Sequence, residues 1–167
     1  SLAPSEMCIR DSESTWQSLN NNEGAPLLNH ATQRPLPPGS TFKVLTTVTA
    51  LEQGASPDTS VTGAPQITLP DTTTTLENYG GSTCGGATTT LRQAFAQSCN
   101  TAFAELGMQY GADALKDVAK RFGIGETHDD AGLPIQPSAV GDIPDQSSLG
   151  QTSIGQRDVS FTCLLYT

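Results

Sequence analysis

The sequence predicts a mainly helical fold in which four helices are joined by long loops, with little continuous strand. Apolar residues recur at helical spacing in four segments, and each segment stops at a glycine or a polar break. The stretches between these segments are rich in Thr, Ser, Gly and Pro, which favour turns over helix. With 167 residues, of which 16 are Gly and 11 are Pro, the chain suffices for one domain or most of one, with a modest core.

Local signals set the bounds of each predicted helix. Pro35–Gly39 prevents regular structure ahead of the first helix, and Gly54 follows that helix. Thr90 is a typical N-cap for the second helix, and a break at Ser98–Asn100 separates the second from the third. The helices are predicted at Ser40–Gln53, from the cap Thr90 onward, at about Thr101–Tyr110 and at Asp113–Phe122. The remaining segments are predicted as the irregular Ser14–Leu28, the turn-rich Ser56–Ala87 with short extended pieces, and the loop His128–Leu149.

Charge and hydropathy argue against two classes of function. The net charge is −9, and no cluster of Lys and Arg is available to follow a phosphate backbone, so nucleic-acid binding is not expected. No apolar run reaches the roughly 18–20 residues that span a bilayer, and no signal peptide opens the chain. If the parent protein is exported, its targeting segment is expected to lie outside this fragment.

The two ends of the chain share an unusual relationship at the level of DNA. Met7–Ser12 can be encoded by ATG TGT ATA AGA GAC AG, and the reverse complement of that DNA contains TGT CTC TTA TAC ACA, which encodes Cys163–Thr167. We therefore interpret residues 1–12 and 163–167 as derived from a sequencing adapter, and residues 13–162 as a partial domain. The alternative is coincidence.

Without those ends, two cysteines remain, Cys84 and Cys99. Two cysteines in a polar, Gly-rich setting suit an exported domain with one disulfide, and the alternative is two buried free thiols. A zinc site with His30 and His128 is a weaker alternative, because the chain has no C-x-x-C or H-x-x-x-H spacing. No metal and no cofactor are expected.

The most informative motif is S-x-x-K at Ser40–Lys43, directly ahead of the first apolar helical run. Residues i and i+3 share a helix face, so the Ser40 hydroxyl and the Lys43 amine come within hydrogen-bond reach. A serine hydroxyl is a poor nucleophile until a base removes its proton, and lysine serves as that base where burial destabilises its ammonium form. The alternative for S-x-x-K alone is an N-cap serine and a surface lysine.

A second serine with an amide neighbour lies at the predicted helix break. Ser98 is expected to relay a proton between Lys43 and the leaving group, and Asn100 to bind an amide of the substrate. The alternative is a plain capping turn. A similar S-x-N occurs at Ser18–Asn20, but it precedes the nucleophile in a polar stretch, and we interpret it as chance.

Together these motifs resemble the transpeptidase domain of class B penicillin-binding proteins, and most specifically the actinobacterial penicillin-binding protein A group. The resemblance rests on Asn29-His30-Ala31, Pro37-Pro38-Gly39-Ser40-Thr41-Phe42-Lys43, Leu76-Glu77-Asn78-Tyr79-Gly80-Gly81, Ser98-Cys99-Asn100-Thr101-Ala102-Phe103 and Ser153-Ile154-Gly155-Gln156-Arg157-Asp158-Val159. It implies an α+β fold, of which this fragment holds mainly the helical lobe with long loops while most of the central sheet is missing.

The resemblance also implies an activity and a place in the cell. It implies a D,D-transpeptidase that cross-links peptidoglycan on the extracytoplasmic face of the membrane and is acylated by β-lactams. Ser40 would be the acylated nucleophile, Lys43 its general base, and Ser98 and Asn100 the second-motif pair. The family's K-T-G strand is absent after Ser98, so the fragment alone is expected to show little or no activity. The expected partners are peptidoglycan stem peptides, β-lactams and cell-division or elongation proteins.

Three other readings remain open at this point. The first is a β-lactamase or D,D-carboxypeptidase that uses the same S-x-x-K site, and the second is a β-lactam-sensing domain that is acylated without turnover. The third is a non-enzymatic secreted domain in which the motifs arose by accident.

Overall fold

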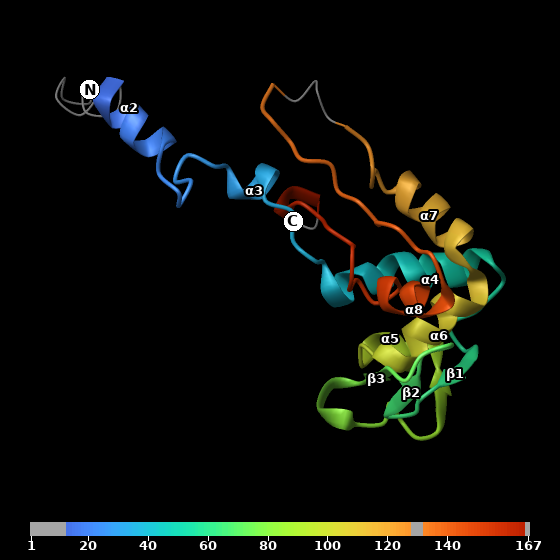
Figure 1. Ribbon diagram of the computed structural model, residues 1–167. Coiled ribbons are helices and arrows are strands. Elements are labelled where there is room, and N and C mark those ends of the chain that lie inside the picture. Colours follow the sequence, from blue (N-terminus) through green and yellow to red (C-terminus); the bar gives the residue numbers. More distant parts are fainter. Residues whose placement is uncertain (1–12, 128–131, 166–167) are drawn as a thin grey trace.

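The computed structural model describes residues 13–127 and 132–165. Four helices, α4, α6, α7 and α8, lie together, and two small antiparallel sheets lie beyond α5 at one side of them (Figure 1). The N-terminal α2 extends away from this body, and α3 lies beside the C-terminal turn (Figure 1). The α-helices are α2 (Glu13–Asn20), α3 (His30–Gln33), α4 (Lys43–Glu52), α5 (Leu91–Ala96), α6 (Asn100–Tyr110), α7 (Ala112–Arg121) and α8 (Gln146–Thr152). Among the described residues the 3₁₀ turns are η1 (Gly39–Phe42), η2 (Tyr79–Gly81) and η4 (Cys163–Leu165).

The four predicted helices are confirmed as α4 with its leading turn η1, α5, α6 and α7. The local signals act as expected: the Thr90 side chain accepts a hydrogen bond from the Gln93 N–H, which caps α5. Gly111, at φ 89°, ends α6 and leads directly into α7.

The prediction of irregular structure for Ser14–Leu28 is wrong where α2 forms. The sequence of α2 has only two large apolar residues, Trp16 and Leu19, which is too short a pattern for periodicity to detect, and no described residue of α2 is buried. Its turns are supported instead by a side-chain hydrogen bond from Gln17 Nε2 to Glu13 Oε1, 2.8 Å long and four residues apart. The short α3 also went unpredicted, and its signal was the N-cap Asn29, whose side chain accepts from Ala31 N.

The prediction of loop throughout His128–Leu149 is wrong where α8 begins. Five of its seven residues are buried, but these are mostly Ser, Gly and Thr rather than large apolar residues. The sequence therefore lacks an apolar stripe, and the remaining signal was the cap Asp145, whose carboxylate accepts from Ser148 N at 2.7 Å. Residues 128–131 lie outside the described part of the chain.

Small residues let α8 approach α6 and α4 closely. A Cβ on Gly107 would fall on the Ser153 side chain, and one on Gly150 would lie 3.6 Å from Ala104 Cβ. The hydroxyl of Thr46 in α4 donates to Ser153 O at 2.7 Å. Contacts this close leave little freedom between the helices, so α4 and α6 are held in one relative position.

The turn-rich segment Ser56–Ala87 forms short extended pieces as predicted, β1, β2 and β3, while β4 lies after it and was not predicted. β1 (Ser60–Thr62) pairs antiparallel with β4 (Thr88–Thr90), and β2 (Gln66–Thr68) pairs antiparallel with β3 (Thr75–Glu77). Gln66 lies opposite Glu77 in the second pair. The end of β3 also lies beside the start of α6, where Asn100 Nδ2 donates to Glu77 O.

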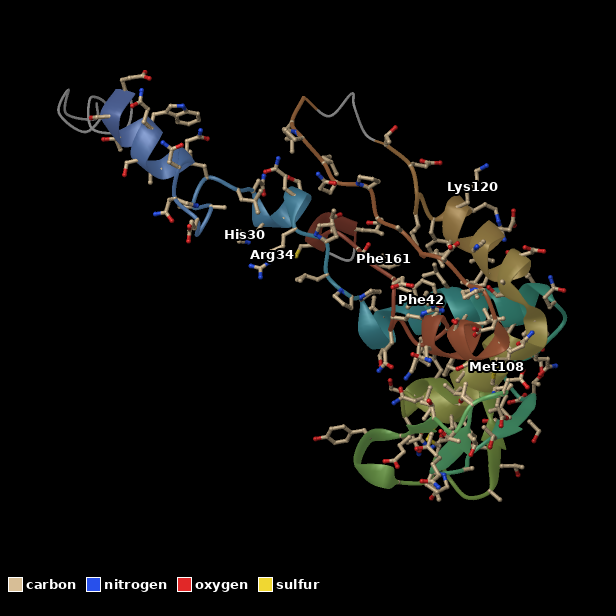
Figure 2. All side chains as sticks on the ribbon, in the orientation of Figure 1. His30, Arg34, Phe42, Met108, Lys120 and Phe161 are labelled. Carbon is tan, nitrogen blue, oxygen red and sulfur yellow. A yellow bond between two sulfur atoms is a disulfide. The ribbon has the colours of Figure 1, made fainter. Side chains whose placement is uncertain are left out.

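Two apolar cores lie on either side of α4. One core contains Ala50 of α4 with Phe103 and Leu106 of α6, and the other contains Leu45 of α4 with Leu115 of α7. Phe42 and Phe161 join the second core with ring centroids 5.8 Å apart, and Figure 2 labels both side chains. Because α4 is buried from both sides, its first turn has a fixed position relative to α6.

Candidate active site

The nucleophile candidate lies at the entrance to α4. Ser40 belongs to the 3₁₀ turn η1, and Lys43 is the first residue of α4. The Lys43 Nζ atom lies 3.2 Å from Ser40 Oγ, so the two side chains meet as the spacing predicts. Gly39, at φ 56°, turns the chain into η1, and its N–H donates to Gly155 O at 3.1 Å.

The second predicted pair, Ser98 and Asn100, lies where α5 gives way to α6, and its side chains reach the Ser40–Lys43 contact. The Ser98 hydroxyl lies 3.0 Å from Ser40 Oγ and 3.0 Å from Lys43 Nζ, and its backbone carbonyl accepts from Lys43 Nζ at 2.6 Å. Ser98 has φ 55°, a left-handed conformation that is uncommon for a residue other than glycine. This conformation lets the hydroxyl and the carbonyl of one residue face the same amine.

Asn100, the first residue of α6, completes the cluster. Its Oδ1 accepts from Lys43 Nζ at 2.7 Å, and its Nδ2 donates to the backbone carbonyl of Glu77 at 2.8 Å. The Glu77 carbonyl is only an acceptor, so it determines which way the Asn100 amide points. The structure thus brings all four predicted site residues together, with one amide hydrogen of Asn100 left for another acceptor.

Lys43 is deeply buried for a lysine, with 2% of the residue exposed. Burial lowers the pKa of Lys43 from the ordinary value of 10.5 to about 8, because an ammonium is poorly solvated there. Its Nζ lies 5.7 Å from the centroid of the Phe103 ring. No carboxylate among residues 13–127 and 132–165 forms an ion pair with Lys43. The surroundings therefore supply dipoles rather than a countercharge.

The hydrogen bonds of Lys43 suit the neutral amine. Two of its neighbours, the Ser98 carbonyl and Asn100 Oδ1, can only accept, and together they engage two N–H groups. A neutral amine has two N–H groups and one lone pair, and the remaining neighbours are the hydroxyls of Ser40 and Ser98. Since Ser98 Oγ donates its hydrogen to Ser40 Oγ, the hydroxyl left to donate to this lone pair is that of Ser40, which is the arrangement a general base requires.

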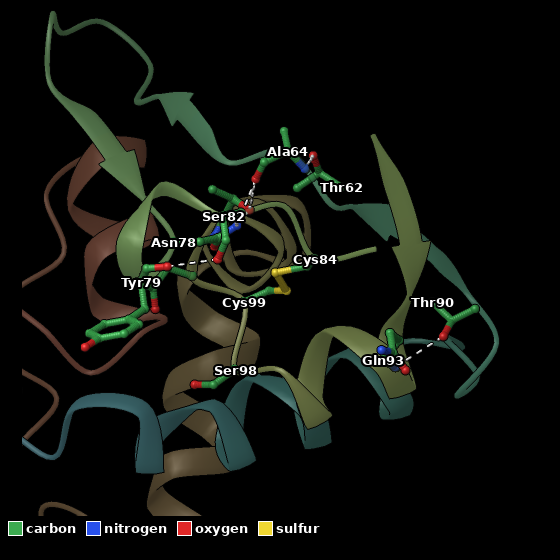
Figure 3. The surroundings of a disulfide bond; sticks show 12 residues. Thr62, Ala64, Asn78, Tyr79, Ser82, Cys84, Thr90, Gln93, Ser98 and Cys99 are labelled. Atoms are coloured by element: carbon green, nitrogen blue, oxygen red, sulfur yellow. Dashed lines mark hydrogen bonds between the residues drawn. A yellow bond between two sulfur atoms is a disulfide. The ribbon is translucent and has the colours of Figure 1, made fainter. Parts of the chain in front are cut away.

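In the structure Cys84 and Cys99 form a disulfide, which Figure 3 shows beside Ser98. It joins the loop before β4 to the turn between α5 and α6. Both cysteines are buried. Since Cys99 lies between Ser98 and Asn100 in the chain, the covalent link holds the turn that presents both side chains.

We expect reduction of this disulfide to lower the free energy of unfolding by about 3 kcal/mol, because the cysteines are 15 residues apart and a loop of that size is restricted in the unfolded chain. Denaturant unfolding with and without reductant measures the difference. Alkylation followed by mass spectrometry is the control, and modification of Cys84 and Cys99 without prior reduction would contradict the link.

No group of three or more His, Cys, Asp or Glu side chains arranged to hold a metal ion occurs among the described residues. His128 lies outside them, so the zinc alternative with His30 stays untested. Sequence reasoning missed the Glu77 carbonyl and Gly155 as contacts of the site. Both are backbone groups, and only the motifs around them, Leu76–Gly81 and Ser153–Val159, could have drawn attention to them.

Comparison with known proteins identifies the family. The model of the family described as "Penicillin binding protein transpeptidase domain" matches residues 9–165. The chain belongs to the penicillin-binding protein transpeptidase family. The α+β transpeptidase fold implied by the sequence motifs is therefore confirmed, for a part of that domain.

Members of this family with close similarity come from mycobacteria. The chain is 51% identical over 150 residues to the peptidoglycan D,D-transpeptidase PbpA of Mycolicibacterium smegmatis, which covers 89% of this chain and 30% of the relative. The PbpA of Mycobacterium tuberculosis matches equally, at 51% identity. The structure resembles penicillin-binding protein A from M. tuberculosis in its penicillin G acyl-enzyme complex, with a TM-score of 0.87, 47% identity, and coverage of 99% of this chain and 37% of the other. The chain thus spans about 30% of the length of the curated relatives it matches.

Proposed function

We propose that the chain is the nucleophile-bearing part of a serine D,D-transpeptidase that cross-links peptidoglycan and is acylated by β-lactams. The observation that carries the proposal is the cluster of Ser40, Lys43, Ser98 and Asn100 around a buried lysine whose pKa lies near 8. The names of the mycobacterial relatives favour a transpeptidase over a β-lactamase, a D,D-carboxypeptidase or a β-lactam sensor.

In this mechanism Ser40 Oγ attacks the carbonyl carbon of a peptide or a β-lactam. The Lys43 amine takes the proton of the hydroxyl as the bond from oxygen to carbon forms. When the bond from carbon to nitrogen breaks, the proton passes through the Ser98 hydroxyl, 3.0 Å from both Lys43 Nζ and Ser40 Oγ, to the leaving nitrogen. N–H groups in the first turn at Ser40 stabilise the oxyanion, and the remaining amide hydrogen of Asn100 donates to a substrate carbonyl.

The proposed location is the extracytoplasmic face of a bacterial membrane. The Cys84–Cys99 disulfide supports an oxidising compartment. None of the helices in residues 13–127 and 132–165 has the length and hydropathy to cross a bilayer. Stem peptides as substrates, and cell-division or elongation proteins as partners of the whole enzyme, belong to the same proposal.

We also propose that residues 1–12 and 163–167 derive from adapter DNA rather than from the gene. The support is that one short DNA encodes Met7–Ser12 on one strand and Cys163–Thr167 on the other. Sequencing the source locus across Thr162 tests this, and an unbroken genomic Cys163–Thr167 would contradict it.

The proposed activity is tested by labelling the full-length protein with a fluorescent penicillin. Label is expected on the wild type and on Ser18→Ala, and none is expected on Ser40→Ala. Ser18 is the matched control because it is an exposed serine of α2 that also opens an S-x-N sequence. Equal labelling of Ser40→Ala and wild type would rule out Ser40 as the nucleophile.

The pKa of Lys43 predicts how acylation depends on pH. The rate constant is expected to rise through a midpoint near pH 8, where Lys43 loses its proton. Unfolding gives a second readout: between about pH 8 and 10.5 the unfolded chain holds more protons than the folded one, so the free energy of unfolding rises with pH. Stopped-flow acylation and denaturant unfolding over this range measure both. An acylation rate independent of pH across the range would refute Lys43 as the base.

A further inference from the structure

Asn78 is a buried polar residue beside the site that the proposed chemistry does not use. It follows β3 directly, and 5% of the residue is exposed. Its Nδ2 donates to Ala64 O at 2.9 Å and to Ser82 O at 3.0 Å. Its Oδ1 accepts from Thr101 N at 3.1 Å, and Thr101 Oγ1 lies 3.3 Å from it. Figure 3 shows Asn78 beside Ser82 and near the disulfide.

These hydrogen bonds use both donors of the Asn78 amide and one acceptor site of its oxygen. They join three separate parts of the chain: the segment after β1, the loop after η2 and the first turn of α6. The Thr101 hydroxyl also donates to Ala64 O at 2.9 Å, which closes the network. A buried network in which every member is satisfied holds its parts in one arrangement.

The strand pairing then determines where the Glu77 carbonyl points. Asn78 N donates to Pro65 O, and Thr74 O accepts from Leu69 N, both at 2.9 Å across the β2–β3 pair. Alternate residues of an antiparallel strand face opposite edges. Glu77, next to Asn78, therefore turns its backbone carbonyl away from β2 and toward α6, where it accepts from Asn100 Nδ2 at 2.8 Å.

The orientation of the Asn100 amide determines which of its polar atoms faces Lys43 Nζ. With Nδ2 engaged by Glu77 O, Asn100 presents Oδ1 to Lys43 Nζ. An amide turned by half a rotation would present N–H groups to the amine instead, and would compete with the serine hydroxyls for its lone pair. The side chain of Asn78 lies one residue from Glu77 and bonds to the residue after Asn100, so it couples both ends of this contact.

The geometry points to Asn78 as a positioning residue for acylation, which acts by holding the Glu77 carbonyl against Asn100 so that Asn100 presents its oxygen to Lys43. This inference rests on the proposed function. Asn78 touches neither the nucleophile nor the base, and its effect on the reaction passes through Asn100.

A double-mutant cycle in the full-length protein tests this route. Asn78→Ala is expected to lower the limiting acylation rate constant for a fluorescent penicillin roughly 10- to 100-fold, as for a misplaced reacting group, with the dissociation constant of the initial complex unchanged. In an Asn100→Ala background the same substitution is expected to change the rate constant less than about threefold, because the residue through which it acts is gone. An equal fold-loss of the rate constant in both backgrounds would overturn the inference. That result would mean that Asn78→Ala acts independently of Asn100, as a general loss of structure does.

The control is Ser138→Ala, which removes a buried hydroxyl that accepts from Thr162 N and contacts no site residue. Its acylation rate constant is expected to stay within about twofold of wild type. If Asn78→Ala does not fold, Asn78→Asp takes its place: it keeps the shape and the acceptor for Thr101, but sets a second oxygen against the carbonyls of Ala64 and Ser82.

A crystal structure of the variant that folds decides the inference without any acylation. Asn100 Nδ2 and Glu77 O are expected to separate beyond hydrogen-bond distance, and Asn100 Oδ1 to leave Lys43 Nζ. Retention of both contacts would overturn the positioning role. A wild type that takes no label would refute the proposed function, while this structural comparison would still decide the role of Asn78.

Discussion

Replacing Lys43 by alanine is expected to lower acylation of Ser40 by roughly 10²- to 10⁴-fold, the range that a positioned general base contributes. Lys43 Nζ contacts both serine hydroxyls of the site, and its lowered pKa makes the neutral amine available near neutral pH. Without it, no described side chain that contacts Ser40 Oγ is a base. The measurement is the acylation rate constant with a fluorescent penicillin in the full-length protein.

Two variants separate the loss of the base from other effects. Lys43→Arg keeps a positive charge, but a guanidinium does not give up its proton in proteins, so it is expected to lose as much activity as Lys43→Ala. Lys120→Ala removes an exposed lysine of α7 and is expected to leave acylation unchanged. Wild-type rates in Lys43→Arg would show that Lys43 acts through its charge and not as a base.

Replacing Gly155 by alanine is expected to lower the free energy of unfolding by roughly 3 kcal/mol and to weaken acylation with it. Gly155 has φ 72°, and a Cβ there would fall on the carbonyl oxygen of Gly39 and lie 2.8 Å from Phe42 Cβ. Gly39 directly precedes Ser40 and donates its N–H to Gly155 O. The new methyl group would therefore add overpacking to backbone strain and displace the turn that carries Ser40, the proposed nucleophile. Thermal or denaturant unfolding and the acylation rate measure the two effects.

Gly132 is the matched control for this substitution. Its φ of 71° is almost the same, but a Cβ at Gly132 would meet no atom of the described residues within 4 Å. Gly132→Ala is therefore expected to show the backbone strain alone, about 1 kcal/mol, with acylation unaffected. Equal losses in the two variants would mean that the contact between Gly155 and Gly39 contributes nothing beyond the conformation of the glycine.

Much of the helical part of the fold could be predicted from the sequence because its signals are local. Proline and glycine ahead of Ser40, the cap Thr90 and the apolar spacing in α6 and α7 act within one or two turns of chain. The helix α8 could not be predicted in the same way. Its buried residues are mostly small and polar, and their burial depends on the close approach of α6.

The candidate site likewise contains one contact that local spacing predicts and others that depend on tertiary packing. The i, i+3 spacing of Ser40 and Lys43 brings their side chains together wherever that segment is helical, so this contact is a property of the sequence. The contacts of Lys43 with Ser98 and Asn100 join residues 55 and 57 positions apart. They depend on how α4 packs against α6.

The sequence by itself predicts that the side chains of Ser40 and Lys43 meet, and it nominated them with Ser98 and Asn100 as the candidate site, because residue type and short-range spacing carry that information. The tertiary structure decided that Lys43 is buried, so that its pKa falls to about 8, and that the Glu77 carbonyl turns the Asn100 amide toward it. The desolvation of Lys43 and the orientation of the Asn100 amide both depend on groups that are distant in the chain. Only tertiary packing brings those groups into position.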